Sequence, residues 1–312
     1  MTIHHTLRRL MFAPCALSLV LFLIPHPAMA CACGCGVFDV GGAALFPGCQ
    51  GGMGFFEFDH MDQTQNLSGT SSAPAADNDD KEILSDFYSL GGQYMFNRSW
   101  GVMAQLPLVH RDVTSDPGTG VQTFHHTAPG DLMITGLYTG FSKDLSTGVT
   151  FGLKLPTGDF SYSGFDRDTE TGTGTTDAIL GAYHLGPLTK DADWTYFGQV
   201  KWQHALDYRD GYRPGDEADG AVGIYYEPGQ TGDKLRLVPL LQFLGSHRNR
   251  DSGSQADPAN SGYTRLLVAP GFEVKAKAWS LYSDVEFPVY QRVNGDQLVA
   301  PVLFKVILSR SF

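Results

Sequence analysis

Four cysteines beyond residue 30 are the residues best suited to chemistry in this chain. Cys31, Cys33 and Cys35 alternate with small residues, and Cys49 follows a glycine-rich stretch. Closely spaced thiolates can bind a soft metal such as copper(I) or zinc. A disulfide between Cys49 and one of the first three is a second hypothesis, and lipidation of Cys31 is a third. The choice depends on the compartment, so the rest of the chain must be interpreted first.

The other candidate sites are weaker. His125 and His126 are adjacent, so in an extended chain their side chains point in opposite directions. The acidic run at 77–80 lacks the spacing and the glycine of a calcium loop. The sequence holds no Gly-x-Ser-x-Gly and no His-Glu-x-x-His pattern. We therefore expect neither an enzyme nor a cofactor.

The first thirty residues are typical of a secretory signal peptide. They carry Arg8 and Arg9, an apolar stretch "ALSLVLFLI" and the small-residue end "AMA". The apolar stretch is short for a membrane-spanning helix, which needs about 20 residues. Cleavage after Ala30 would make Cys31 the first mature residue, and export implies an oxidising compartment.

The mature chain is strongly acidic. It keeps 20 basic and 33 acidic residues, which is a net charge of −13. Such a balance argues against nucleic acid as a partner.

Short segments in which apolar and polar residues alternate recur from residue 53 to the end, which predicts an all-β chain. Each is close to the ten residues that a tilted strand needs to cross a membrane. The twelve predicted strands are 53–62, 86–97, 100–111, 131–142, 147–157, 176–187, 194–207, 219–228, 233–246, 263–275, 278–292 and 298–312.

The connections between these strands alternate in length. Turns as short as "RS" at 98–99 and "KA" at 277–278 alternate with longer loops such as 158–175. The longer connections hold 22 acidic and 8 basic residues, so the net negative charge gathers at one end. Short periplasmic turns and long outer loops are typical of an antiparallel up-and-down barrel in the outer membrane. An even strand number places both termini, and the cysteine-rich leader, at the periplasmic mouth.

Apolar and charged residues separate onto the two faces of the predicted strands, as expected with lipid outside and water inside. These inward charges either tune a polar path or pair across a filled interior. The predicted lumen-lining residues are Glu57, Asp59, Lys154, Lys201, Lys234, Arg236, Glu273, Lys275, Asp284, Glu286 and Lys305.

Prolines and aromatic residues refine this expectation. Because proline cannot donate to a strand ladder, we expect bulges or unpaired positions wherever one interrupts a strand. Trp100, Trp194 and Trp279 near the short turns and Tyr208 near a loop fit the aromatic girdles of a barrel. The prolines concerned are Pro107, Pro239, Pro270, Pro288 and Pro301.

The chain ends on an aromatic residue after an alternating apolar pattern, "LFKVILSRSF". This pattern resembles the signal that the barrel-assembly machinery recognises, although Arg310 stands where an apolar residue is usual. The residues of the predicted signal are Phe304, Val306, Leu308 and Phe312.

The segments "APGDLMITGLYTGF" at 128–141, "FGLKLPTGD" at 151–159 and "DVEFPVYQRV" at 284–293 resemble a family of outer-membrane transporters linked to meta-pathway phenol degradation. The resemblance implies passive passage of small molecules, apolar or aromatic ones included. We therefore expect a signal peptide (1–30), a periplasmic leader (31–52) and an outer-membrane barrel channel (53–312), with lipid and lipopolysaccharide around it. The alternative is a non-conducting structural barrel whose acidic loops or leader bind cations, metal or a partner.

Overall fold

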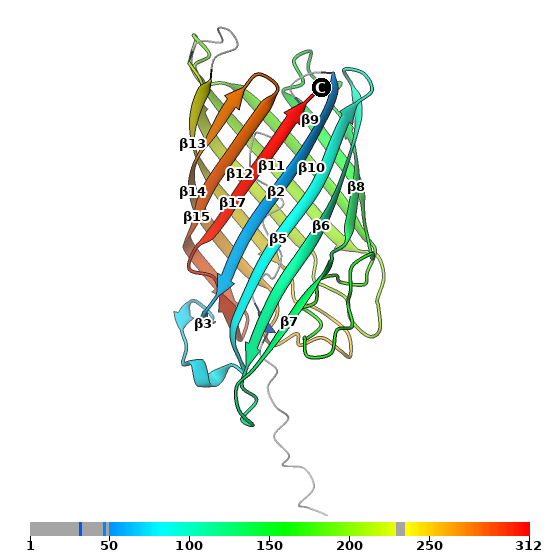
Figure 1. The fold of residues 1–312 in the computed structure, drawn as a ribbon, viewed down its shortest axis with the longest axis vertical. Coiled ribbons are helices and arrows are strands. Elements are labelled where there is room, and N and C mark those ends of the chain that lie inside the picture. The colour runs from blue at the N-terminus through cyan, green and yellow to red at the C-terminus, as the bar shows by residue number, and fades with distance from the viewer. Residues whose placement is uncertain (1–30, 33–45, 48–49, 229–234) are drawn as a thin grey trace, which may run out of the picture.

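A computed structural model describes residues 31–32, 46–47, 50–228 and 235–312. Its main sheet closes on itself through the pairing of β5 with β6, giving an antiparallel barrel of twelve strands (Figure 1). The predicted fold class is therefore confirmed. Within the described residues, no helix is long and apolar enough to span a membrane.

The barrel strands follow each other around the wall in chain order. The fourth wall position is shared by two short strands, β7 and β8, which both pair with β6. The bounds are β2 (Gly51–Gln63), β5 (Asp80–Met95), β6 (Trp100–Ser115), β7 (Gln122–Pro129), β8 (Leu132–Tyr138), β9 (Thr147–Leu155), β10 (Asp177–Pro187), β11 (Trp194–Ala205), β12 (Glu217–Tyr226), β13 (Arg236–Arg248), β14 (Tyr263–Ala276), β15 (Trp279–Val293) and β17 (Leu303–Ser311).

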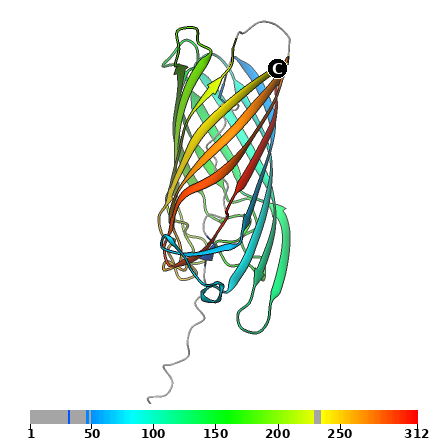
Figure 2. The same cartoon turned by 90° about the vertical axis from the view of Figure 1, so that its left-hand side faces the viewer.

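Short turns and the C-terminus lie at one end of the barrel, and the long connections lie at the other (Figures 1 and 2). We call these the turn end and the loop end. At the loop end β6 and β7 extend beyond the wall as a hairpin, visible in Figure 2. A 3-10 helix, η2 (Ala75–Asp77), and two small strands, β3 (Gln65–Ser68) and β4 (Ser71–Ser72), also lie there.

The first described residues lie at the loop end as well. Cys31–Ala32 form strand β1, which pairs in parallel with Gln297 and Leu298 of β16 (Asp296–Val299). This position differs from the periplasmic mouth predicted for the start of the leader. The prediction rested on an even strand number, which fixes the side at which the barrel strands begin and end but not the position of residues that precede the first strand.

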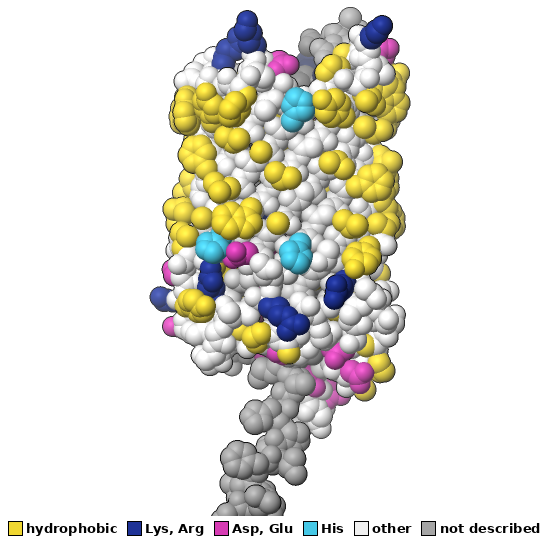
Figure 3. Space-filling model, turned by 180° about the vertical axis from the view of Figure 1, so that it is seen from behind, with side chains coloured by type: hydrophobic (Ala, Val, Ile, Leu, Met, Phe, Trp, Pro, Cys, Tyr) yellow, Lys and Arg dark blue, Asp and Glu magenta, His cyan; other side chains and the backbone are white. Residues whose placement is uncertain are grey.

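The alternation of the strands sorts side chains as predicted. Leu237, Val222 and Val200 are more than half exposed on the outer wall, whereas Glu273 and Asp284 on neighbouring strands are buried inside. Figure 3 shows apolar side chains over the wall, with charged side chains concentrated toward its two ends. A barrel in the outer membrane has this distribution, because lipid contacts only the outer face between the two rims.

Aromatic side chains gather at the turn end. The ring of Trp100 lies 4.7 Å from that of Tyr138, and the ring of Trp194 lies 4.9 Å from that of Tyr226. The Arg310 guanidinium lies 5.4 Å from the Trp279 ring centroid. This cation–π contact accounts for a charged residue within the apolar pattern of the last strand. Tyr208 is exposed in a connection at the loop end.

Prolines coincide with irregular pairing. The register of β14 against β15 shifts between Leu266 and Leu267, whose partners Tyr290 and Pro288 skip one residue. The ladder of β6 passes from β8 to β7 around Pro107, whose carbonyl accepts the Gly130 N–H at 2.8 Å. Pro270 has no pairing partner in β15. The pairing of β13 with β12 ends at Leu240, so the adjacent Pro239 has no partner in β12. Pro301 lies between β16 and β17, outside both.

Candidate functional site: the barrel lumen

The wall strands point a layered set of charged side chains into the lumen. At the turn end Glu227 binds Arg236 at 2.5 Å and Lys275 at 2.8 Å, and Glu273 lies 3.4 Å from Lys275. These four groups, from β13, β14 and the residue after β12, form a closed ionic cluster at the turn-end mouth.

A second layer lies deeper in the barrel. Lys305 of β17 approaches Glu57 at 3.4 Å and Asp59 at 3.3 Å on the neighbouring strand β2. Asp284 on the other side of β17 accepts hydrogen bonds from Tyr282 at 2.5 Å and Gln242 at 2.8 Å. All these side chains are buried, and buried charges require such partners because they have lost water.

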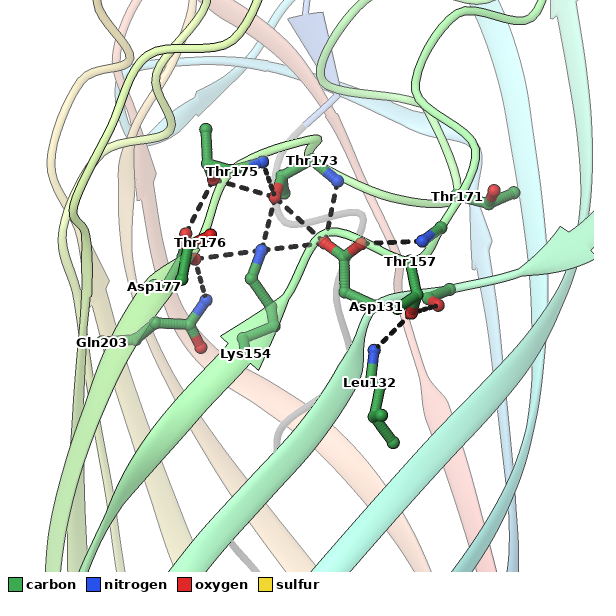
Figure 4. A network of polar contacts seen from close by, with 12 residues as sticks. Asp131, Leu132, Lys154, Thr157, Thr171, Thr173, Thr175, Thr176, Asp177 and Gln203 are labelled. Atoms are coloured by element: carbon green, nitrogen blue, oxygen red, sulfur yellow. Dashed lines mark hydrogen bonds and ion pairs between the residues drawn. The ribbon is translucent and has the colours of Figure 1, made fainter.

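The third layer is the network of Figure 4, near the loop end. Lys154 of β9 lies 3.0 Å from both Asp131 and Asp177. The Asp131 carboxylate also accepts the backbone N–H groups of Gly158 and Thr173, each at 3.0 Å. The connection 158–176 is therefore held at both of its ends by one buried carboxylate.

This connection folds inward over the lumen. Arg111 of β6 donates to the carbonyl oxygens of Thr169 at 2.5 Å and Glu170 at 3.0 Å. Arg167 donates to the carbonyl oxygens of Phe160 at 2.7 Å and Thr173 at 3.0 Å, which holds the connection in a compact shape. The loop end of the lumen is thus narrowed by residues 158–176.

Three cavities follow each other inside the barrel. A loop-end cavity of 180 Å³ and a central cavity of 130 Å³ share Gln105, Met133 and Lys201 in their walls. The central cavity and a turn-end cavity of 410 Å³ share Phe46, Pro47 and Gln93. Since neighbouring cavities have walls in common, they form an interrupted path along the barrel.

The central cavity has a mostly apolar wall. Met103, Met133, Leu137, Ile179 and Tyr183 contribute to it, together with a few amide and charged groups. Such a lining suits an uncharged molecule that has a large apolar part.

Ten of the eleven predicted lumen residues lie in these layers or cavities; Lys234 lies outside the described residues. Lys201 pairs with Asp219 at 3.4 Å, and Glu286 is buried near Lys305. Most of these charges pair with opposite charges inside the barrel, yet cavities remain between the layers. The two hypotheses for the inward charges, tuning of a polar path and pairing across a filled interior, remain predictions.

Sequence reasoning missed several interior groups. Asp131, Asp177 and Arg111 each lie at or next to the end of a predicted strand, and none of them was predicted to line the lumen. Of these strands only the one that contains Arg111 continues further than predicted, to Ser115. The alternation in β6 would have assigned Arg111 to the interior, two residues after Val109. No sequence signal places Phe46 in the lumen.

The cysteine question remains a set of three hypotheses. Cys33, Cys35 and Cys49 lie outside the described residues, and only the main chain of Cys31 is described. Among the described residues, no group of three His, Cys, Asp or Glu side chains has the arrangement of a metal site.

The structure defines a class of protein: a twelve-stranded outer-membrane barrel with a narrowed lumen. The family described as "Putative MetA-pathway of phenol degradation" matches residues 62–277, more than half of the chain, and the protein belongs to this family. No curated protein matches the sequence.

Solved structures support the fold. The barrel is similar to an outer-membrane channel from Pseudomonas putida F1, with a TM-score of 0.67 and 13% identity, over 88% of this chain and 100% of that one. It is also similar to the β-domain of the Bordetella autotransporter BrkA, with a TM-score of 0.51 and 13% identity, over 85% of this chain and 100% of that one.

The inward connection predicts a dependence on pH. Burial, with the Asp159 carboxylate nearby, raises the pKa of Glu170 to about 7, and burial also raises the pKa of Asp166. A carboxyl whose pKa is raised by packing binds a proton more readily in the packed state. The packing of the connection 158–176 is therefore most stable below the ordinary pKa of a glutamate side chain, and it weakens as the pH rises through about 7, the raised pKa of Glu170.

We expect single-channel conductance to be higher at pH 8 than at pH 5.5, because the connection 158–176 packs less firmly at the higher pH. Glu170→Gln should reduce this difference, since the amide does not titrate. Asp191→Asn, in an exposed turn at the other end, serves as the control. An identical pH response in wild type and Glu170→Gln would show that Glu170 does not govern the packing.

Proposed function

We propose that this protein is a passive channel for small uncharged molecules, monocyclic aromatic compounds among them, across the outer membrane. The observation that carries the proposal is the path of three adjacent cavities along the inside of a membrane-spanning barrel. A barrel filled only for stability would pack its interior without a series of adjacent cavities.

The chemistry of the path favours uncharged solutes. The charged side chains largely pair with each other across the lumen, as Lys154 does with Asp131 and Asp177. They therefore contribute less net field to attract an ion than isolated charges would. The apolar wall of the central cavity and the description of the family both support an aromatic solute.

The narrow central cavity limits the size of the solute. A cavity of 130 Å³ holds a molecule of about one ring. Larger solutes would require movement of the connection 158–176 or of Phe46. The proposal involves no energy coupling and no catalytic step.

Planar bilayers test the proposal directly. Purified protein should give discrete conductance steps in potassium chloride, and a deletion strain should take up phenol more slowly than the parent at micromolar concentrations. Folded protein that gives no steps, together with unchanged uptake, would favour the non-conducting structural barrel instead. Folding is verified beforehand by the shift in gel mobility on heating.

The division into a signal peptide (1–30), a leader (31–52) and a barrel (53–312) is part of the same proposal, as is recognition of the last strand by the barrel-assembly machinery. Phe304 and Leu308 of β17 point outward toward the lipid, which supports the predicted signal. Removal of Phe312 should lower the yield of heat-modifiable barrel in cells; an unchanged yield would argue against the signal. Lipopolysaccharide is the proposed lipid around the loop-end rim.

The mass of the intact mature protein separates the hypotheses for Cys31, Cys33, Cys35 and Cys49. A diacylglyceryl increment indicates a lipid anchor, and a loss of two hydrogens indicates a disulfide. Free thiols that retain copper or zinc indicate a metal site.

A further inference from the structure

One side chain separates the central cavity from the turn-end cavity. Phe46 lines both cavities, and it precedes the first wall strand. Its ring stacks on Tyr183, with centroids 4.6 Å apart and planes 12° apart. It forms a T-shaped pair with Phe197, with centroids 6.1 Å apart and planes 71° apart. Both geometries are the preferred ones for aromatic pairs.

The two partner rings are fixed by the wall. Tyr183 of β10 lies across Gly148 of β9, its cross-strand partner, where an added Cβ would stand 2.5 Å from the Tyr183 ring. The Tyr183 hydroxyl donates to the Leu145 carbonyl oxygen at 3.0 Å. These contacts hold the ring flat against the wall, because only glycine leaves room for it there.

Phe197 is held in the same way. It belongs to β11 and lies across its partner Gly223 of β12, where an added Cβ would stand 2.6 Å from the ring. The wall therefore supplies two aromatic surfaces in fixed positions, whereas the third ring comes from outside the wall. Such an arrangement is a preformed site with a separate occupant.

We propose that Tyr183 and Phe197 form a binding site for a single uncharged aromatic ring, and that Phe46 occupies this site as a tethered competitor. The inference rests on the proposed function and names the site at which an aromatic solute pauses in the lumen. A solute that stacks on Tyr183 must displace Phe46, and displacement joins the central and turn-end cavities. The channel thus opens in response to the molecule that it passes.

A hydrogen-bonding group near the site refines the class of ligand. Gln93 lines both cavities, and its buried Oε1 atom accepts no hydrogen bond from the described residues. A buried acceptor without a donor is unfavourable, and a hydroxyl on the ring would supply the donor. A phenol therefore fits the site better than a hydrocarbon ring without a donor.

Phe46→Ala tests the proposal. The dissociation constant of phenol for purified protein is measured by ligand-observed NMR, with cyclohexanol as the saturated counterpart. A tethered ring occupies the site for part of the time. The apparent affinity for phenol is then the intrinsic affinity multiplied by the fraction of time for which the site is vacant. We expect Phe46→Ala to bind phenol roughly 2- to 10-fold more tightly than wild type, with little change for cyclohexanol.

Two further variants complete the design. Phe141→Ala removes an exposed ring in a short turn and should leave phenol binding unchanged. Tyr183→Leu in the Phe46→Ala background should return phenol binding to the wild-type level or below; if this protein does not fold, Phe197→Leu takes its place.

The outcomes separate this inference from the proposed function. Equal phenol affinity in wild type and Phe46→Ala would overturn the aromatic site, even if both proteins conduct ions. Tighter phenol binding by Phe46→Ala would support the site, even if neither protein conducts. An equal gain in affinity for phenol and for cyclohexanol in Phe46→Ala would show that the substitution only enlarges a cavity without preference for an aromatic ring. That result would also overturn the proposal.

Discussion

Asp131→Ala is expected to release the connection 158–176 from the lumen and to raise the ionic conductance several-fold. The Asp131 carboxylate accepts hydrogen bonds from the Gly158 and Thr173 N–H groups and from the Thr173 hydroxyl, all at 3.0 Å. A hydrogen bond to a charged group contributes about 1.5–3 kcal/mol. Alanine removes all three, whereas Lys154 keeps Asp177 as its partner. The wall should therefore survive while the connection loosens.

Limited trypsin digestion reports the release, because Arg167 lies in the middle of the connection and is held there by the carbonyl oxygens of Phe160 and Thr173. Cleavage after Arg167 should become fast in Asp131→Ala. Asp131→Asn keeps an acceptor oxygen without the charge and should give an intermediate rate. Asp144→Ala, in an exposed turn at the other end, should cleave like wild type. If Asp131→Ala resists trypsin and conducts like wild type, other contacts hold the connection.

The position of Asp131 follows from an interruption in the pairing of the wall strands. Asp131 lies between β7 and β8, next to Gly130, where an added Cβ would stand 2.8 Å from the Pro107 ring. Pro107 interrupts the hydrogen-bond ladder of β6, and Gly130 leaves room for the Pro107 ring. The next residue, Asp131, points inward and accepts the hydrogen bonds that hold the connection 158–176. A local irregularity of the sheet thus positions the Asp131 carboxylate, which holds the connection that narrows the loop end of the lumen.

The wall could be predicted from the sequence because its rule is local. Alternation along a strand decides which side chain meets lipid and which meets the lumen. The inward direction predicted for Arg236 therefore needed no knowledge of any neighbour, and Arg236 lines the turn-end cavity. The charges of Lys305 and Glu57 could likewise be placed inside, since each follows the parity of its own strand.

The contacts across the lumen could not be predicted, because they depend on how the barrel closes. Asp131 meets Gly158 and Thr173 only once β8 and β9 pair and the following connection folds inward. The pairing of Cys31 with Gln297 joins positions at opposite ends of the chain, and Phe46 reaches Tyr183 from a segment without strand periodicity. Such long-range contacts leave no periodic pattern in the sequence.

Lys305→Met is expected to lower the free energy of unfolding by about 3–5 kcal/mol, the usual cost of removing one partner from a buried ion pair. Lys305 lies 3.4 Å from Glu57 and 3.3 Å from Asp59, and all three side chains are buried. Methionine fills a similar volume but leaves both carboxylates without their ammonium partner. Urea unfolding in lipid vesicles, followed by tryptophan fluorescence, measures the loss.

Two comparisons separate charge from packing in this cluster. Adding Glu57→Gln and Asp59→Asn to Lys305→Met should recover most of the lost stability, because a neutral cluster no longer holds unpaired charges. Lys275→Met removes a lysine whose side chain is 27% exposed and should cost less, since water partly replaces its partners. Equal losses for Lys275→Met and Lys305→Met, or no recovery in the triple variant, would mean that Lys305 stabilises the barrel through packing rather than charge.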